Sequence, residues 1–500
     1  MLTYSFEKIG SDSLYEYLYK CIRDDILAGN ITAGTRLPSK RTFAKNLGIS
    51  VITVEGAYEQ LRAEGYIYSI AKKGFYVSDL KYTGGIFTVP REESHREELS
   101  KKALPVSKEG GYLADFSSNQ TDSDIFPFTI WTRTIREVLS DSRIELMTNS
   151  PCGGILELRT AIASYLKDFR GMEVSPGQVI VGAGTEYLYG LLIQLLGNGR
   201  IYAVENPGYL KIGKVYESMQ VACRYVDLDA DGISVEQLEA SEADIVHISP
   251  SHHFPTGIVM PISRRYELLG WAAKKKERYI IEDDYDSELR LTGKPVPTLQ
   301  SIDVSGKVIY MNTFSKTLAS TVRISYMVLP KQLADRFYER LSFYSCTVSN
   351  FEQYTLAHFI ENGSFEKHIN RLRNYYQNKR DEILSAFRQS GLTECISISG
   401  EETGMHFLMQ VHAKKKEDEL IREAKAKGIR LVPVSDYCHA GSGSVFEENT
   451  FVMNYASVDV DKIGQIVSIL ERMIREKRGE QQSMNTASLL LKDKWPKTGY

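Results

Sequence analysis

The sequence has few cysteines and little that could cross a membrane. Its six cysteines are scattered along 500 residues and form no C-x-x-C pair, which excludes a disulfide scaffold, a zinc ribbon and a thioredoxin motif. No apolar run approaches the roughly 20 residues that a membrane span needs. The N-terminal residues also lack the apolar core of a secretory signal. We therefore expect a cytoplasmic protein with reduced thiols and no membrane partner.

The chain also lacks a large excess of either charge. Lys and Arg number 61 and Asp and Glu number 64, so the formal net charge is −3. This balance excludes a uniformly basic coat for nucleic acid, although it allows a local basic patch. At roughly 100–200 residues per domain, the length predicts two to four domains.

Composition divides the chain into parts. Residues 80–112 are dense in charge and poor in apolar side chains, which is typical of a linker. The alternative is that these residues form an exposed helical segment of one larger domain. We expect a head at 1–79, a linker at 80–112, a body at 113–478 and a C-terminal tail at 479–500.

The pattern of the head predicts three helices and then two short strands. Apolar residues recur at helical spacing over 14–26, and Ser39 and Ser50 are N-cap candidates for two further helices. Residues 66–69 and 74–78 read as strands joined by a turn. This order is typical of a winged helix-turn-helix, in which the helix after the tight turn enters the major groove.

Cations gather in the head although the whole chain is slightly acidic. Between residues 36 and 73 there are seven Lys and Arg and three Glu, a local balance of +4. Because phosphate contacts supply most sequence-independent affinity for DNA, we expect double-stranded DNA as a partner. The alternative is a merely solvated basic face. The candidate DNA-binding residues are Arg36, Ser39, Lys40, Arg41, Ser50, Thr53, Arg62, Lys72 and Lys73.

The body alternates strands with helices and predicts an α/β fold with a largely parallel sheet. In such sheets ligands bind at the turns that follow the carboxyl ends of the strands. The expected apolar strands lie at 178–181, 201–204, 245–248, 279–281 and 308–311.

Lys316 follows one of these strands and is flanked by hydroxyls at Thr313 and Ser315. A lysine amine there can form a Schiff base with an aldehyde, and the hydroxyls together with Arg323 can hold a phosphate. Asp283 follows a neighbouring strand, and a carboxylate is the partner that a protonated pyridine nitrogen requires. Aldehyde, phosphate and pyridine together describe pyridoxal 5′-phosphate (PLP). A surface lysine on a loop is the simpler alternative. Three further turns after expected strands, in the segments 184–186, 205–209 and 280–286, disfavour it.

The head resembles the GntR family of bacterial regulators. The match runs through the string GTRLPSKRTFAKNLGIS of residues 34–50, then Thr53, Val54 and the segment AYEQL at 57–61. The family usually has a basic residue after the turn serine, where this chain has Val51. The resemblance implies a winged helix-turn-helix that binds an operator.

The body, from about residue 113 to 478, resembles the fold-type I PLP-dependent enzymes of the aspartate aminotransferase superfamily. The resemblance implies that Lys316 holds PLP as a Schiff base, that Asp283 binds the pyridine nitrogen and that Tyr285 binds the ring hydroxyl. It also implies that Tyr209 stacks on the ring. Thr185, Thr313, Ser315 and Arg323 match phosphate contacts, while Gly184 and Glu186 belong to the cofactor loop.

The two parts together resemble the MocR/PdxR/GabR subfamily of regulators, which implies a homodimer. The string SPSHHFPTG at 249–257 is similar to the subfamily's version of an aminotransferase turn, with Phe254 in place of the asparagine that faces the ring hydroxyl. Val452 stands where aminotransferases place an arginine for the substrate carboxylate, and Lys211 or Arg430 could substitute for it.

We therefore expect a transcriptional regulator that binds DNA through its head and senses PLP itself, or an amine or amino-acid effector, through PLP on Lys316. Phe254 and Val452 argue for at most weak transaminase activity. The alternatives are a functional aminotransferase with a vestigial head and a PLP carrier that does not bind DNA. We expect no metal site, because His252 and His253 have no ligand partner at metal-binding spacing.

Overall fold

The computed structural model divides into two compact units, residues 1–107 and residues 108–500. The predicted tail at 479–500 and nearly all of the predicted linker at 80–112 lie outside the described residues. None of the helices in the described part of the chain is long and apolar enough to cross a membrane. The structure describes residues 3–6, 9–10, 12–80, 111–118, 125–291, 296–439 and 446–475.

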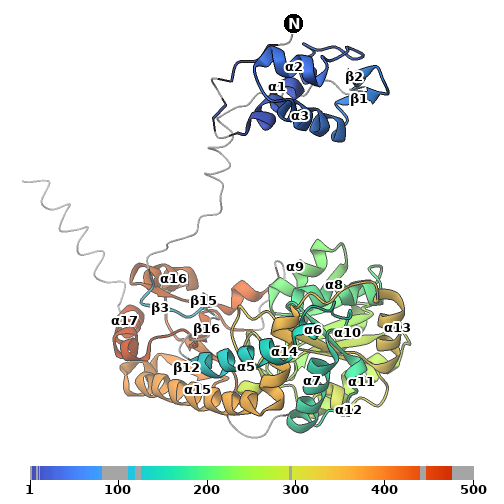
Figure 1. The fold of residues 1–500 in the computed structure, drawn as a ribbon. Helices are drawn as coiled ribbons and strands as arrows, with labels where there is room; N and C mark the ends of the chain where they lie inside the picture. The colour runs from blue at the N-terminus through green and yellow to red at the C-terminus, as the bar shows by residue number, and fades with distance from the viewer. Residues whose placement is uncertain are drawn as a thin grey trace, which may run out of the picture. The chain divides into compact units, whose positions relative to one another are not determined.

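In the described residues of the first unit, three helices precede a two-stranded antiparallel hairpin (Figure 1). This order confirms the predicted winged helix-turn-helix. The elements are α1 (Leu14–Leu27), α2 (Lys40–Leu47), α3 (Val51–Ala63), β1 (Ile67–Ile70) and β2 (Gly74–Val77).

Serine side chains begin the second and third helices of the head. Ser39 accepts a hydrogen bond of 3.1 Å from the backbone N–H of Thr42, and Ser50 accepts one of 3.1 Å from that of Thr53. Each bond satisfies one of the N–H groups that a helix start leaves without a partner. Gly48, at φ 68°, ends α2 in the left-handed region and opens the tight turn. These features fix the start of α3.

One small core holds the head together, because each helix and the hairpin turn an apolar face inward. On α3 the buried residues fall three and four positions apart, which places them on one side of the helix. The core includes Leu18, Ile22, Phe43, Val54, Tyr58, Leu61, Ile67 and Val77.

The described part of the body is built on an eight-stranded sheet of order β4-β11-β10-β9-β8-β5-β6-β7. The pairs from β10 through β9, β8 and β5 to β6 are parallel, which confirms the predicted α/β fold. β11 is antiparallel to β4 and β10, and β7 is antiparallel to β6. The strands are β4 (Val179–Gly182), β5 (Ile201–Asn206), β6 (Ala222–Asp229), β7 (Gly232–Ile233), β8 (Ile245–Ile248), β9 (Tyr279–Asp283), β10 (Val308–Thr313) and β11 (Ser325–Val328).

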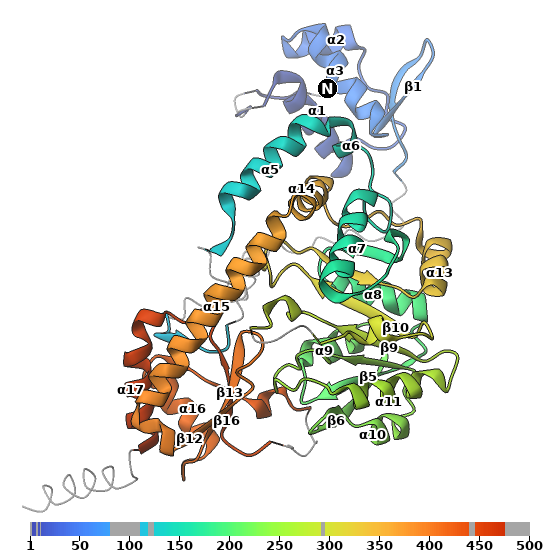
Figure 2. The ribbon, with the colours of Figure 1, turned by 90° about the horizontal axis from the view of Figure 1, so that it is seen from below.

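Helices cover both faces of this sheet (Figure 2). Alternate residues of β5 show the two faces: Tyr202 packs with α8 (Thr185–Leu196) and α13 (Lys331–Leu341), whereas Ala203 packs with α10 (Val235–Ala240) and α11 (Ile262–Ala273). The other helices of this region are α5 (Phe128–Asp141), α6 (Arg143–Leu146), α7 (Leu156–Arg170), α9 (Leu210–Ser218), α12 (Leu299–Ile302) and α14 (Asn350–Glu361).

The C-terminal part of the body forms a second layer with its own core. In the described residues, β12 (Ile396–Ser399), β13 (His406–Val411), β16 (Thr450–Asn454) and β15 (Val432–Pro433) make an antiparallel sheet in that order. It packs against α15 (Ser364–Gln389), α16 (Glu417–Ala426) and α17 (Ile463–Arg475). Two short strands, β3 (Ala114–Asp115) and β14 (Ile429–Arg430), pair in parallel beside it.

Candidate functional site

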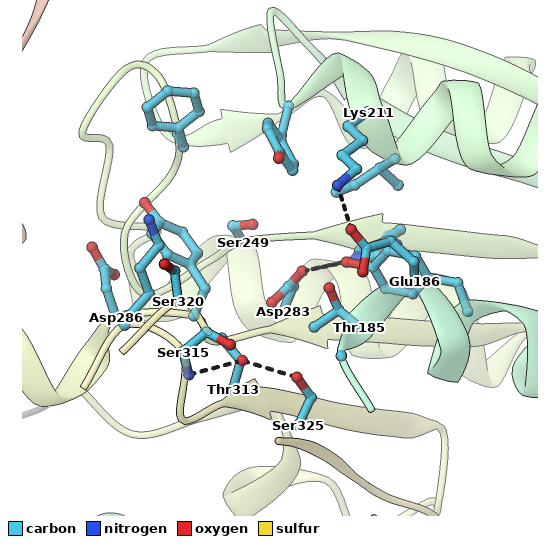
Figure 3. Close-up of a pocket in the computed structure, with 18 of the residues that line it drawn as sticks. Thr185, Glu186, Lys211, Ser249, Asp283, Asp286, Thr313, Ser315, Ser320 and Ser325 are labelled. Atoms are coloured by element: carbon cyan, nitrogen blue, oxygen red, sulfur yellow. Dashed lines mark hydrogen bonds and ion pairs between the residues drawn. The ribbon is translucent and has the colours of Figure 1, made fainter. Parts of the chain in front are cut away.

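A cavity of about 300 Å³ lies at the carboxyl ends of the parallel strands β5, β8, β9 and β10 (Figure 3). The start of α8 closes one side, and His406 and Asn454 reach it from β13 and β16 of the second sheet. The structure thus brings together the four turns that the sequence singled out. All ten predicted cofactor residues line it, namely Gly184, Thr185, Glu186, Tyr209, Asp283, Tyr285, Thr313, Ser315, Lys316 and Arg323.

Asp283 is the last residue of β9, and two side chains orient its carboxylate. Tyr189 donates a hydrogen bond of 3.0 Å to Oδ2, and Nε2 of His247 lies 3.4 Å from the same oxygen. Tyr216 holds the other ring nitrogen of His247 at 2.7 Å. The second oxygen, Oδ1, is buried and has no hydrogen-bond partner among the described residues. A buried acceptor without a partner is unfavourable, and the protonated pyridine nitrogen of PLP would supply the missing donor.

Lys316 lies in the turn after β10, half-buried in the cavity wall. Burial lowers the pKa of its amine, and the nearby carboxylate of Asp286 opposes that shift. Within the described part of the chain the amine makes no hydrogen bond or ion pair. A lowered pKa increases the unprotonated fraction, which is the form that attacks an aldehyde.

Hydroxyl groups and a helix start gather at one end of the cavity. Thr185 begins α8, where backbone N–H groups and the helix dipole favour an anion. Thr313 Oγ1 accepts hydrogen bonds from the hydroxyl of Ser325 at 2.9 Å and from the backbone N–H of Ser315 at 3.2 Å. Gly184 has φ 93°, and a side chain there would overlap a neighbouring guanidinium. The donors present suit a phosphate.

Glu186 pairs with two cations beside this group, Lys211, which Figure 3 shows, and Arg323. Its carboxylate pairs with Lys211 through one oxygen and with Arg323, at 2.5 Å, through the other. Burial alone would raise the pKa of Glu186, but hydrogen bonds from these cations lower it to about 2. Lys211 and Arg323 can therefore bind an anionic ligand, but the carboxylate of Glu186 competes with that ligand for both cations.

Aromatic contacts surround Phe254, the residue that stands in place of the expected asparagine. Its ring packs edge-on against Tyr209 at 6.2 Å, His406 at 5.2 Å and Tyr437 at 5.0 Å between centroids. A phenyl ring in this setting offers no hydrogen bond to a ring hydroxyl. Tyr285, expected to bind that hydroxyl, has its own hydroxyl 3.3 Å from Nδ1 of His252.

The adjacent histidines contact carboxylates and a hydroxyl. Nδ1 of His252 lies 2.7 Å from Asp286, and Nδ1 of His253 lies 2.7 Å from Thr256. Burial and the neighbouring His252 lower the pKa of His253 to about 3, so this ring is neutral at physiological pH. No group of three or more His, Cys, Asp or Glu in the described ranges could hold a metal ion.

The candidate substitutes for a carboxylate-binding arginine lie in different places. Val452 is buried and packs against Leu408 and Val434 in the second sheet. Lys211 lines the cavity, whereas Arg430 lies 3.5 Å from Asp115 and is not among the described residues that line it. Geometry therefore favours Lys211.

Several polar cavity residues were given no role in the sequence analysis, among them Tyr189, His247, Glu205 and His406. Tyr189 could have been found, because it lies one helical turn after Thr185 on the same helix. His247 carried a weaker signal as a polar residue inside an apolar strand. Glu205, which accepts a 2.9 Å hydrogen bond from the N–H of Ser249, and His406 gave no local signal.

Seven of the nine candidate DNA-binding residues are exposed on the surface of the head, and Lys40 and Thr53 are partly buried. Lys40 is half-buried, forms an ion pair of 2.6 Å with Glu55 and lies 5.5 Å from the ring centroid of Phe75. Its charge is thus partly used within the fold. The exposed candidates are Arg36, Ser39, Arg41, Ser50, Arg62, Lys72 and Lys73, and Thr53 is half-exposed.

Comparisons with known proteins agree with this two-part organisation. The family model described as bacterial regulatory proteins, gntR family, matches residues 14–77, and the model for aminotransferase class I and II matches residues 113–469. Among solved structures, the multiple substrate aminotransferase of Thermococcus profundus superposes with a TM-score of 0.64 and is 25% identical. The similarity covers 79% of this chain and 96% of that one.

Curated relatives share both parts. The uncharacterized HTH-type transcriptional regulator YdeL of Bacillus subtilis is 40% identical over 84% of this chain and 89% of its own length. The probable rhizopine catabolism regulatory protein MocR of Rhizobium meliloti is 32% identical over 89% of this chain and 90% of its own length. The chain therefore belongs to the MocR-type transcriptional regulators, in which a GntR-type winged helix-turn-helix is joined to an aminotransferase class I and II domain.

Proposed function

We propose that this chain regulates transcription by binding operator DNA through its head and by holding PLP in the cavity of its body, covalently attached to Lys316. The observation that carries the proposal is the convergence of ten predicted residues on one cavity, where Oδ1 of Asp283 is buried and has no hydrogen-bond partner among the residues that the structure describes. The gntR-family match to the head supports the DNA-binding part.

Each group of cavity residues has a proposed task in holding the cofactor. Asp283 would hold the pyridine nitrogen, with Tyr189 and His247 fixing the orientation of its carboxylate. The start of α8, Thr313 and Ser315 would hold the phosphate. Bound PLP supplies an aldehyde that reacts with amines and a protonated ring that withdraws electrons.

We propose a sensor and not an efficient enzyme. Phe254 offers no hydrogen bond for the ring hydroxyl, and Val452, buried in a cluster against which Phe254 packs, offers none for a substrate carboxylate. The effector is PLP itself or an amine, and Lys211 is the cavity cation best placed for a carboxylate on such an amine. An amine that displaces Lys316 from PLP would leave a free lysine amine in a half-buried place near Asp286 and so give the body a second state. An effector can move the head only by binding two states of the protein with different affinities.

We also propose a cytoplasmic homodimer with the parts given above: head 1–79, linker 80–112, body 113–478 and tail 479–500. MocR-type relatives that match along nearly their whole length support this organisation. Cytoplasmic location follows from the proposed DNA partner.

The test is an absorbance spectrum of the purified protein with PLP, before and after candidate amines are added. We expect a visible band that shifts with an effector amine, together with salt-dependent binding to the chain's own upstream DNA. Turnover of an amino donor and a keto acid at typical enzymatic rates, about 1–10³ s⁻¹, would instead favour the aminotransferase alternative. A band without DNA binding would indicate a PLP carrier.

A further inference from the structure

The start of α3 presents two apolar side chains to solvent. Ile52 is 80% exposed and lies away from the side of α3 that buries Val54 and Tyr58, whereas Val51 is 41% exposed at the start of that side. Ser50 caps the helix, so both residues stand on a rigid first turn. Single exposed apolar residues are common, but Ile52 lies off the buried side at the base-contacting end of a recognition helix, where packing does not explain it, and the partly exposed Val51 stands beside it.

This first turn also lacks the groups that read guanine or adenine. Residues 51–54 carry no guanidinium, ammonium, carboxylate or amide side chain. The hydroxyl of Thr53 lies 2.8 Å from that of Ser50 and is already engaged in the cap. In the next turn Glu55 is paired with Lys40. Bidentate hydrogen bonds to a base are therefore unavailable at the position where they are usually made.

Exposed cations on elements that pack against or adjoin α3 favour nucleic acid over a protein as the occupant. Arg41 at the start of α2 and Lys72 and Lys73 in the hairpin turn are exposed, and none forms an ion pair within the described residues. Apolar side chains at the start of a recognition helix, on a head that also carries exposed cations, match a major groove, where phosphates flank the base edges. On those edges the apolar group is the C5-methyl of thymine.

We propose that Val51 and Ile52 read thymine methyl groups in the operator. This inference rests on the proposed binding of operator DNA and adds which bases the recognition helix selects. Contact with a thymine methyl group buries the apolar surface of about one carbon atom. Each such thymine should therefore strengthen binding about fourfold. The operator half-site should therefore contain thymine at one or two fixed positions facing α3.

Deoxyuridine, which lacks only this methyl group, provides the test. The full-length protein first selects duplexes from a random-sequence pool, and each thymine of a selected duplex is then replaced by deoxyuridine. Binding is measured by fluorescence anisotropy at one salt concentration. We expect about fourfold weaker binding at one or two positions, and we expect Ile52→Ala or Val51→Ala to abolish that sensitivity.

Ile144→Ala is the matched control, because Ile144 is equally exposed at 80% but lies in the body. It should keep the full sensitivity to deoxyuridine. If Ile52→Ala and Val51→Ala both respond to deoxyuridine as the unmodified protein does, the inference is wrong. If Ile52→Ala changes the oligomeric state of the protein without DNA, Ile52 lies in an interface between two copies of the chain and the inference is wrong. Failure of the unmodified protein to bind any duplex would overturn the DNA-binding proposal itself.

Discussion

Tyr189 donates a 3.0 Å hydrogen bond to Oδ2 of Asp283, while Oδ1 of the same carboxylate is buried without a partner in the described part of the chain. A helix and a strand far apart in sequence thus fix this carboxylate and leave one of its acceptors for a ligand. In a poorly solvated cavity a hydrogen bond to that acceptor is stronger than it would be in water.

Asp283→Asn should weaken PLP binding about 10- to 100-fold, because a hydrogen bond to a charged group is worth about 1.5–3 kcal/mol. The amide can accept a hydrogen bond but carries no charge to keep the pyridine nitrogen protonated. Absorbance titration with PLP measures the loss. Asp335→Asn, at an exposed position on α13, is the control and should bind normally. Equal affinity of Asp283→Asn and the unmodified protein for PLP would contradict the proposal that Asp283 binds the pyridine nitrogen.

Glu205 should make the PLP-free protein less stable as pH rises. Burial raises its pKa from 4.5 to about 8, and the hydrogen bond from the N–H of Ser249 only partly opposes this shift. Between these values the unfolded chain releases a proton that the folded protein retains. The stabilisation that protonated Glu205 contributes is complete below pH 4.5 and is lost progressively as the pH rises to about 8. The loss is about 1.4 kcal/mol per pH unit, a few kcal/mol in all.

Thermal unfolding at a series of pH values measures this loss. Glu205→Gln should flatten the decline between pH 5 and 8, whereas Glu448→Gln at an exposed position should leave it unchanged. An identical slope in Glu205→Gln and the unmodified protein would contradict the assignment.

Glu186→Gln should strengthen binding of inorganic phosphate about fivefold. The substitution removes the carboxylate that pairs with Arg323 and Lys211, and one charge at a partly exposed site is worth about 1 kcal/mol. Isothermal titration with phosphate checks this in the PLP-free protein. Glu173→Gln, at a strongly exposed position, serves as the control. Weaker phosphate binding in Glu186→Gln would mean that Glu186 positions Arg323 for the anion.

Arg41→Ala should weaken DNA binding for all sequences alike and lower the salt dependence by about one phosphate contact, without changing PLP uptake. Lys40→Ala should also disturb the fold, because Lys40 pairs with Glu55. Arg388→Ala on the body is the control. Parallel loss of DNA and PLP binding in Arg41→Ala would indicate misfolding instead of a lost contact.

Much of the fold could be predicted from local patterns. The serine caps at Ser39 and Ser50 and the apolar run of β9 lie where the sequence indicated, because caps and buried strands depend on neighbouring residues. The position of Lys316 after β10 follows in the same way. Local chemistry therefore located both candidate sites.

Pairings between distant segments could not be predicted. β11 runs antiparallel between β4 and β10, and the pattern of Ser325–Val328 does not encode those neighbours. His406 reaches the cavity from a second sheet that local periodicity did not reveal. Tyr189 shares a side of α8 with Thr185, but its hydrogen bond to Asp283 joins segments far apart in the sequence and depends on the fold.

Covalent trapping at Lys316 tests the central proposal most directly. The protein is incubated with PLP, reduced with borohydride, digested and mapped by mass spectrometry. We predict a pyridoxyl adduct on Lys316, loss of the visible band in Lys316→Ala and retention of the band in Lys211→Ala. An adduct on another lysine, or none, would contradict the proposal that this cavity holds the cofactor through Lys316.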